Sequence, residues 1–396
     1  MHPFASYILR SYYKATGWNE DNLYANITRS SNAILDFTVP RGLHLSVSKS
    51  PNSLFKTTYS MNAMPSLNGS IGYIFTSCEL DIKSSGNARF KDMLERFRVY
   101  DQPRRPEPKE EEFFNGERVD KRDYLLYGRF YLPTGRLDAL YSTQVAVRGG
   151  NASNLIFNLQ HDVGKWCTEY TWSADDGVPA VDASSAEQEK VRSPGMKRVD
   201  EEDPIEGGLK GRVSAGAEVY FSAKERSAGI STGFRFTTFP DATPPSFQAP
   251  GSASSPLGAK GPPSQPPTTI TALFNPMLGH ISSAYSARVS RDLSMSSRFD
   301  FNVYSYESEW TLGTEWWMRS SDESEDPSAN PRASSPKGEI RGVVKARAST
   351  KNDVSLMWEG RIRNMLVSLG VVSDFSSRTK PIKAIGLELS YFSSDQ

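Results

Sequence analysis

The sequence predicts an all-β protein, a transmembrane β-barrel, from three observations. Apolar residues alternate with polar ones along most of the chain, as in strands that have one apolar face. The alternating segments run to about ten residues, the length that a tilted strand needs to cross a bilayer. The opposite faces carry Arg, Glu, Asp, Asn and Gly, which a water-filled lumen accepts.

The N-terminus follows a different period, which predicts a short helix within residues 1–18. Phe4, Ile8 and Tyr12 share one face at helical spacing, and Pro3 and Gly17 are natural limits for a helix. We expect this helix to lie in the lumen or at its mouth. The alternative is a frayed amphipathic terminus.

Residues 33–396 are expected to form the barrel, for which we count roughly 18 alternating segments. In one of them, Leu43, Leu45 and Val47 alternate with His44 and Ser46. Aromatic residues gather near the ends of the segments, as the interfacial girdles of membrane barrels do. The same alternation recurs in residues 124–132, 212–221, 281–290 and 298–303.

Four stretches break the alternation and predict long polar loops. They are rich in Ser, Pro, Asp, Glu and Gly, so they cannot bury enough apolar surface to offset the entropy lost on ordering. We expect mobile loops near residues 83–120, 174–207, 240–267 and 320–338.

Composition excludes several classes of protein. Lys+Arg and Asp+Glu are both 46, so the chain has no global basic field that would attract nucleic acid. Nucleic acid is therefore not expected as a partner. Mean hydropathy is −0.51, and no apolar run approaches the roughly 18 residues of a spanning helix. The N-terminus lacks the pattern of a secretory signal, which favours an intracellular chain. A soluble all-β protein remains the alternative to a membrane barrel.

Patterns that carry catalysis are missing from the sequence, so we expect neither an enzyme nor a cofactor. His2, His44, His161 and His280 show no metal-ligand spacing, and the sequence has no P-loop and no dinucleotide fingerprint. A hydrolase built around His280 and its neighbouring serines is the weaker reading, because His280 follows Pro276 and Gly279 and suits a turn that leads into a strand.

The C-terminus ends on a strand suited to closing a barrel. Leu387, Leu389 and Tyr391 share the face that would meet lipid, whereas Gly386 and Glu388 lie on the other. Gly386 would permit close packing against the neighbouring strand.

Five stretches of the sequence form an ordered set: Leu35–Phe37, Leu67–Ser70, Asn275–Ser283 followed by Tyr285–Ala287, Phe299–Ser305 followed by Glu307–Ser308, and Leu356–Gly360. This set resembles the fungal family of mitochondrial distribution and morphology proteins numbered ten. The resemblance covers the expected strands and omits the four loops. It implies a porin-like barrel of about nineteen strands in the mitochondrial outer membrane.

The resemblance also implies a function and partners. Such proteins anchor the endoplasmic reticulum–mitochondria encounter structure, a tether linked to phospholipid exchange, at contact sites between the two organelles. They also associate with the sorting and assembly machinery, which inserts other barrels. Gly386, Leu387, Leu389 and Tyr391 match the sorting signal, but Ala384 stands where a polar residue is preferred. The alternative function is a porin-like metabolite channel.

Two aromatic pairs are candidate partner contacts on the outer wall. Tyr73 and Phe75, and likewise Phe299 and Phe301, stand two residues apart, so each pair shares one face of its strand. Aromatic side chains dominate the anchors of protein interfaces. Ordinary contact with lipid is the alternative reading of both pairs.

Overall fold

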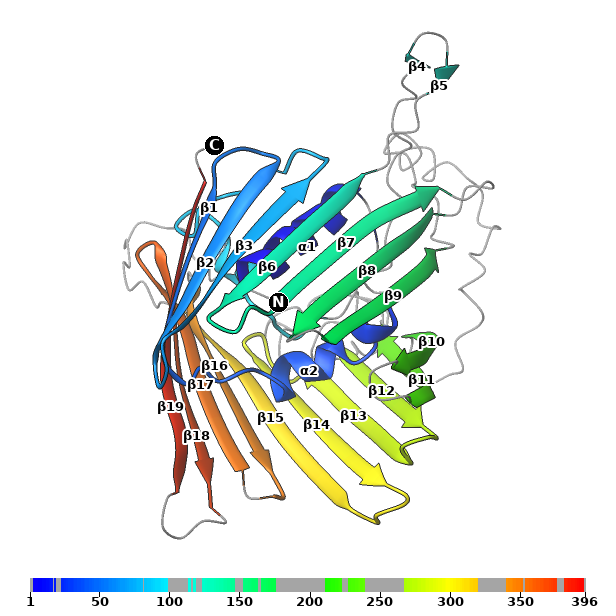
Figure 1. Cartoon of the computed structure of the whole chain (residues 1–396). Coiled ribbons are helices and arrows are strands. Elements are labelled where there is room, and N and C mark those ends of the chain that lie inside the picture. Colours follow the sequence, from blue (N-terminus) through cyan, green and yellow to red (C-terminus); the bar gives the residue numbers. More distant parts are fainter. Residues whose placement is uncertain are drawn as a thin grey trace, which may run out of the picture.

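The structure is a computed structural model in which one large curled sheet surrounds helical segments (Figure 1). It describes residues 3–16, 18, 23–80, 82–98, 113–114, 117–118, 123–146, 152–162, 165–175, 211–222, 227–238, 267–319, 340–351, 353–375 and 381–394. Nineteen strands lie in this part of the chain, and 17 of them form the sheet. The other two, β4 (Phe113–Phe114) and β5 (Glu117–Arg118), pair only with each other.

The strands of the large sheet run from 8 to 13 residues, which matches the expected length of a membrane strand. They are β1 (Gly42–Ser50), β2 (Phe55–Met64), β3 (Asn68–Thr76), β6 (Tyr124–Leu132), β7 (Leu137–Ala146), β8 (Ala152–Asp162), β9 (Lys165–Asp175), β10 (Gly211–Ser222), β11 (Ser227–Thr238), β12 (Thr268–Asn275), β13 (His280–Arg288), β14 (Leu293–Asn302), β15 (Ser308–Arg319), β16 (Ile340–Ser349), β17 (Asp353–Ile362), β18 (Met365–Asp374) and β19 (Ile382–Ser394).

Strands that follow one another in the sheet pair antiparallel, but β1 and β19 pair parallel, in a register from Gly42 opposite Gly386 to Ser50 opposite Ser394. Within the described residues, β9 and β10 are the two ends of the sheet and are not paired with each other. A sheet of alternating strands brings its first and last strands together in parallel only when their number is odd. The predicted β-barrel class is therefore confirmed, with its described sheet open between β9 and β10.

All four of the longest connections begin at the same rim of the sheet. Because strand direction alternates, β3, β9, β11 and β15 all end at one rim, which we call the long-loop rim. The other, short-turn rim carries tight turns such as 133–136 and 276–279, in which Gly135 and Gly279 take positive φ. Of the expected loops, residues 176–207, 240–266 and 320–338 lie outside the described residues.

The inner side of the sheet holds the N-terminal part of the chain, and the predicted short N-terminal helix is confirmed. It is α1 (Pro3–Thr16), in which Phe4, Ile8 and Tyr12 are buried. They pack in one apolar cluster with residues of the wall, such as Ile74 of β3 and Phe392 of β19. Three further helical turns follow: η2 (Tyr24–Asn26), α2 (Arg29–Leu35) and α3 (Phe90–Met93). Among the described residues, no helix combines the length and the apolar character needed to cross a membrane.

Two expected boundaries differ from the structure. Residues 82–98, which include the start of the stretch expected to be a polar loop, bury Phe90, Met93 and Phe97 inside the sheet. Charged residues stand between these apolar residues in the sequence, so the composition of the stretch resembles that of a polar loop. The barrel was expected from residue 33, yet the first strand begins at Gly42, because residues 29–35 form α2.

Candidate functional site: a filled lumen and an aromatic outer wall

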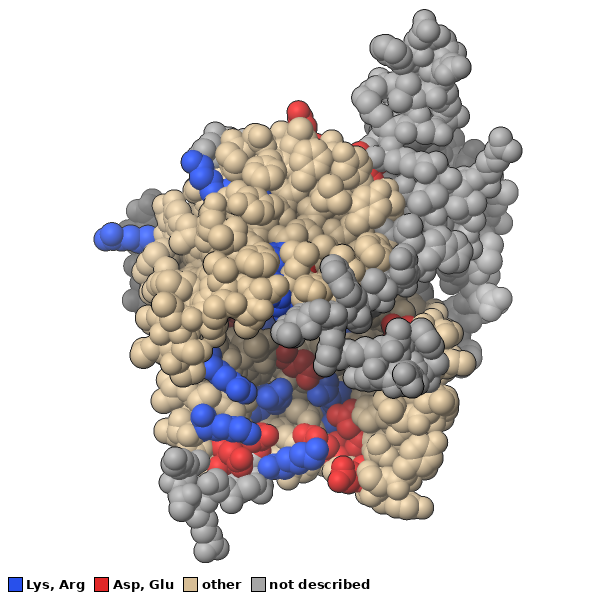
Figure 2. Space-filling view, viewed as in Figure 1, with Lys and Arg blue, Asp and Glu red and all other residues tan. Residues whose placement is uncertain are grey.

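The outer face of the sheet is apolar, as the alternation predicts. In β6, Leu126, Phe130 and Leu132 are exposed, whereas Leu125 and Tyr127 are buried on the inner face. The outer wall of β1–β7 is almost free of charged side chains in Figure 2, which shows Lys, Arg, Asp and Glu gathered in the hollow below that wall. An apolar belt outside and charges inside are what a barrel in lipid requires.

Tyr73 and Phe75 lie in an aromatic row on the outer wall. Tyr73 is 51% exposed and stacks on Phe55 of β2, with ring centroids 5.8 Å apart. Phe75 contacts Tyr124 of β6 at 5.9 Å, and Tyr124 contacts Tyr141 of β7 at 6.3 Å. We call these five residues the β2–β7 aromatic row. The sequence reading missed Phe55, Tyr124 and Tyr141, because only strand register brings them beside the predicted pair.

Phe299 and Phe301 lie on β14, far around the sheet from β3, so the structure does not bring the two pairs together. Phe299 is 46% exposed and stands opposite Trp310 of β15 in the register. Phe301 stands opposite Ile281 of β13. The two pairs therefore lie on separate walls, each among further apolar neighbours.

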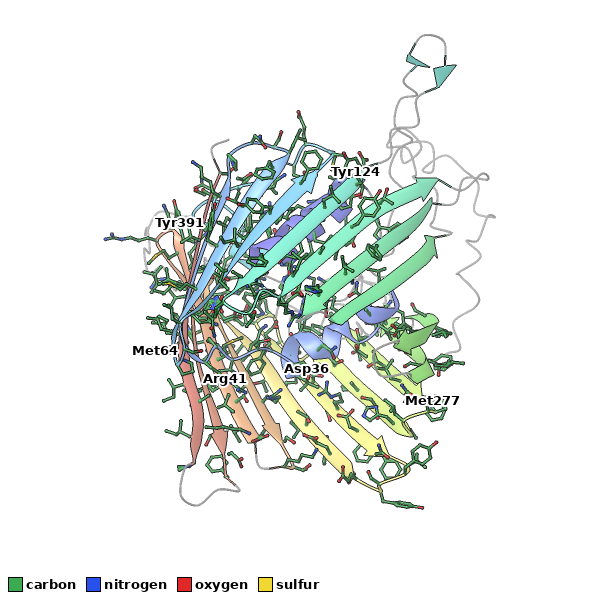
Figure 3. All side chains as sticks on the ribbon, viewed as in Figure 1. Asp36, Arg41, Met64, Tyr124, Met277 and Tyr391 are labelled. Carbon is green, nitrogen blue, oxygen red and sulfur yellow. The ribbon has the colours of Figure 1, made fainter. Side chains whose placement is uncertain are left out.

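Two turns beside Phe301, residues 276–279 and 303–307, also carry apolar side chains, and hydrogen bonds connect them to each other. The Tyr304 hydroxyl donates to the Pro276 carbonyl at 2.8 Å, and the Val303 amide donates to the Gly279 carbonyl at 2.7 Å. Met277 and Tyr306 are 62% and 81% exposed. In Figure 3, Met277 lies at the short-turn rim, at the opposite end of the sheet from Tyr124.

The final strand places its predicted residues on two faces. Leu387, Leu389 and Tyr391 share the outer face, as the alternation predicts, and Gly386 is buried on the inner face. A Cβ atom added to Gly386 would lie 2.2 Å from the Pro40 carbonyl oxygen. The glycine thus makes room for the chain that leads into β1, which the sequence reading did not foresee.

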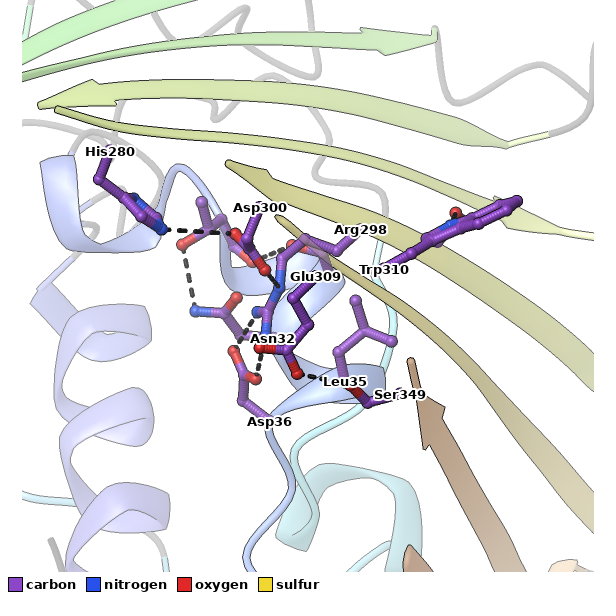
Figure 4. Close-up of polar contacts among 12 residues, drawn as sticks. Asn32, Leu35, Asp36, His280, Arg298, Asp300, Glu309, Trp310 and Ser349 are labelled. Carbon is purple, nitrogen blue, oxygen red and sulfur yellow. Dashed lines mark hydrogen bonds and ion pairs between the residues drawn. The ribbon is translucent and has the colours of Figure 1, made fainter. Parts of the chain in front are cut away.

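Inside the sheet, charged side chains of the wall hold α2. Arg298 of β14 donates to both carboxylate oxygens of Asp36, at 2.6 and 2.9 Å, and to Asp300 at 3.0 Å (Figure 4). Arg347 of β16 donates to the Leu35 carbonyl at 2.9 Å. Figure 3 shows Asp36 inside the sheet and Arg41 where the chain reaches the wall. A bidentate guanidinium–carboxylate pair fixes orientation as well as distance.

Glu95 joins α1, α2 and β16. Its Oε1 accepts from Arg10 at 3.1 Å and from Arg29 at 3.4 Å, and its carbonyl accepts from Lys345 Nζ at 2.5 Å. Burial raises the pKa of this carboxyl, but the Arg10 and Arg29 guanidinium groups outweigh it and hold the pKa below its ordinary value. The ionised carboxylate therefore stabilises the packing of these inner segments against each other at neutral pH. This contribution is lost as pH falls through the lowered pKa.

Wall residues also make hydrogen bonds to residues 82–98 inside the sheet. Glu315 of β15 accepts from the Phe97 amide at 3.2 Å and from Trp317 Nε1 at 2.7 Å. Arg361 of β17 donates to the carbonyls of Gly86 and Ala88 at 3.1 and 2.9 Å. The lumen is thus occupied by the chain itself, through both apolar packing and polar contacts.

Among the described residues, cavities of about 310 and 420 Å³ lie between the inner segments and the wall. Both are lined by Arg10, Arg29 and Glu95, so charges of both signs face them. Nowhere in the described part of the chain do three His, Cys, Asp or Glu residues form a group that could hold a metal ion.

These features define the class of the protein: a β-barrel with an apolar outer wall and a lumen filled by its own N-terminal segments. The chain belongs to the family described as "Mitochondrial distribution and morphology protein 10", whose model matches residues 1–338 and 330–394. Relatives of that name are 70% identical in Laccaria bicolor, across 100% of both chains, and 38% identical in Cryptococcus neoformans, across 98% of this chain and 99% of the relative. In Sclerotinia sclerotiorum the identity is 34%, across 99% of this chain and 100% of the relative. The family resemblance seen in the sequence is therefore confirmed, and with it a role in mitochondrial distribution and morphology.

Proposed function

We propose that this chain is a non-enzymatic scaffold of the mitochondrial outer membrane, placed at contact sites with the endoplasmic reticulum. There it anchors the encounter structure that tethers the two organelles and supports phospholipid exchange, and it also associates with the sorting and assembly machinery. The observation that carries this proposal is the filled lumen. When residues 3–16, 24–41 and 82–98 occupy the interior, the outer wall and the rims are the surfaces left for partners and for lipid.

The proposed partner contacts are the two aromatic pairs, each on its own wall. Tyr73 and Phe75 belong to the β2–β7 aromatic row, and Phe299 and Phe301 adjoin Trp310 and Ile281. Rigid aromatic clusters present large contact areas at low entropic cost, which favours them as anchors of an interface. One pair would serve the tether and the other the sorting machinery.

Double replacement of each aromatic pair should separate the two associations. Tyr73→Ala with Phe75→Ala removes one pair, and Phe299→Ala with Phe301→Ala removes the other. Because an aromatic anchor contributes about 2 kcal/mol or more to an interface, each variant should lose one set of co-purifying subunits and keep the other. The measurement is affinity purification from mitochondria, with subunits of both complexes quantified.

The matched control for these variants is Leu356→Ala with Trp358→Ala, another outward pair with the same spacing on β17. Since alanine remains compatible with lipid, all three barrels should insert normally. If both aromatic variants keep every subunit at the level of the control, the pairs are plain lipid contacts.

The channel alternative makes a different prediction about conductance. Because α1 and residues 82–98 fill the lumen, the purified protein in a planar bilayer should conduct only a small fraction of the current of an open mitochondrial porin. Mixed charge in the lumen should also leave little preference between anions and cations. Large anion-selective steps of porin size would favour the metabolite channel over the scaffold.

A further inference from the structure

Residues 24–41, which we call the inner belt, follow the inner wall from β10 to the start of β1. The Tyr24 hydroxyl lies 2.6 Å from Ser231 Oγ of β11. Farther along the belt, Asp36 pairs with Arg298 of β14, and the Leu35 carbonyl accepts from Arg347 of β16. The belt thus contacts strands of the half-sheet that runs from β10 to β19.

The wall beneath the belt lacks side chains at the points of closest approach. A Cβ added to Gly313 of β15 would lie 2.7 Å from Leu35 Cδ2, and one added to Gly370 of β18 would lie 2.5 Å from Val39 Cγ1. For Gly386 of β19 the distance to the Pro40 carbonyl oxygen is 2.2 Å. Real Cβ atoms do not approach other atoms so closely, so these glycines form a track that the belt requires.

The belt ends where the parallel seam between β1 and β19 begins. Arg41 is its last residue, and the next residue, Gly42, is the first of β1 and stands opposite Gly386. The belt thus crosses Gly370 and Gly386 directly before the chain enters β1 and meets β19. Parallel pairing is slightly weaker per residue than antiparallel pairing, so a fixed starting point matters more at this seam than elsewhere in the sheet.

We propose that the inner belt is a closure element: its placement on the glycine track positions β1 against β19, so that the barrel closes only around a filled lumen. Assembly would then pass through no stage at which a closed but empty pore exists. The contacts that give the belt this role all lie inside the sheet, so the role is independent of the partners that the outer wall binds.

The test uses full-length chains, with Cys78→Ser and Cys167→Ser, and two pairs of introduced cysteines. Ser46→Cys with Ser390→Cys reports the seam, because these residues are register partners in β1 and β19. Ser286→Cys with Ser296→Cys reports an ordinary antiparallel pair, β13 with β14. Each pair is treated with a short thiol crosslinker after refolding, and the crosslinked fraction is measured.

Gly370→Ala places a methyl group under Val39. Gly370 lies on β18, so the substitution changes neither strand of the seam. It should lower the yield of the seam crosslink about five- to thirtyfold and leave the β13–β14 crosslink unchanged. Adding Val39→Ala removes the clashing Cγ1 atom and should restore the seam crosslink. The control is Gly128→Ala on β6, where an added Cβ has no atom within 4 Å, and both crosslinks should match the parent chain.

Only a selective loss at the seam that Val39→Ala reverses supports the closure role. A seam crosslink that persists in Gly370→Ala would overturn it. Loss of both crosslinks, or a seam loss that Val39→Ala leaves in place, would also overturn it, because the glycine would then serve the wall itself rather than the belt.

Discussion

Replacing Leu389 with Arg should lower the free energy of unfolding by about 2–4 kcal/mol, the cost measured for a basic residue on the lipid face near the midplane of a membrane barrel. Leu389 lies on the outer face of β19, between Leu45 of β1 and Val367 of β18 in the register. The measurement is urea unfolding of the protein refolded into lipid vesicles, followed by tryptophan fluorescence. The same variant should assemble poorly when imported into isolated mitochondria.

The matched control is Ile382→Arg at the first residue of β19. Ile382 is 55% exposed and lies at the short-turn rim, where the same change should cost only about 0–1 kcal/mol. A second control, Leu389→Met, keeps an apolar side chain and should behave as the parent does. Equal losses for Leu389→Arg and Ile382→Arg would contradict a lipid-facing wall, because depth in the membrane would then have no effect.

Replacing Lys345 with Met should have the second large effect, a loss of about 3–5 kcal/mol in the free energy of unfolding. Lys345 is 2% exposed on the inner face of β16, with Nζ 2.5 Å from the Glu95 carbonyl and 3.9 Å from Glu359 Oε2. Its removal leaves the Glu359 carboxylate, which is only 15% exposed, without this cation, and it removes the hydrogen bond that ties the wall to residues 82–98. The same urea titration measures the loss.

A double variant separates the charge from the packing. Lys345→Met with Glu359→Gln removes both charges, so most of the lost stability should return. Lys351→Met is the control, because Lys351 pairs with Glu309 at 2.8 Å but is 61% exposed, and it should leave the unfolding midpoint unchanged. If the double variant is as unstable as Lys345→Met alone, the buried pair is not the source of the effect.

Much of the outer wall was predictable because a strand carries its two faces in its own sequence. The outward positions of Leu387, Leu389 and Tyr391 follow from alternation alone, and so does the buried face of α1 from helical spacing. Each of these predictions concerns residues a few positions apart, so it needs no knowledge of the neighbouring strands.

The β2–β7 aromatic row could not be predicted as a whole from patterns within single strands. Tyr73 and Phe75 are visible as a pair in the sequence, but Phe55 and Tyr141 join them only through the registers of β2, β6 and β7. A shift of one residue in any of these pairings would turn the added side chains inward. Register depends on turns and on packing over the whole sheet, which one strand does not encode.

Four features follow from the amino-acid sequence alone: the class of barrel, the apolar outer face, the N-terminal helix and, through the family resemblance, the role in mitochondrial distribution and morphology. The tertiary structure alone decided what fills the lumen. Arg298 meets Asp36 across 262 residues of chain, and Lys345 meets Glu95 across 250. The physical reason is that alternation marks which side chains face inward but not which distant segment they will meet. That choice depends on charge pairing and close packing in the closed interior, where Gly370 and Gly386 leave room for one path of the chain.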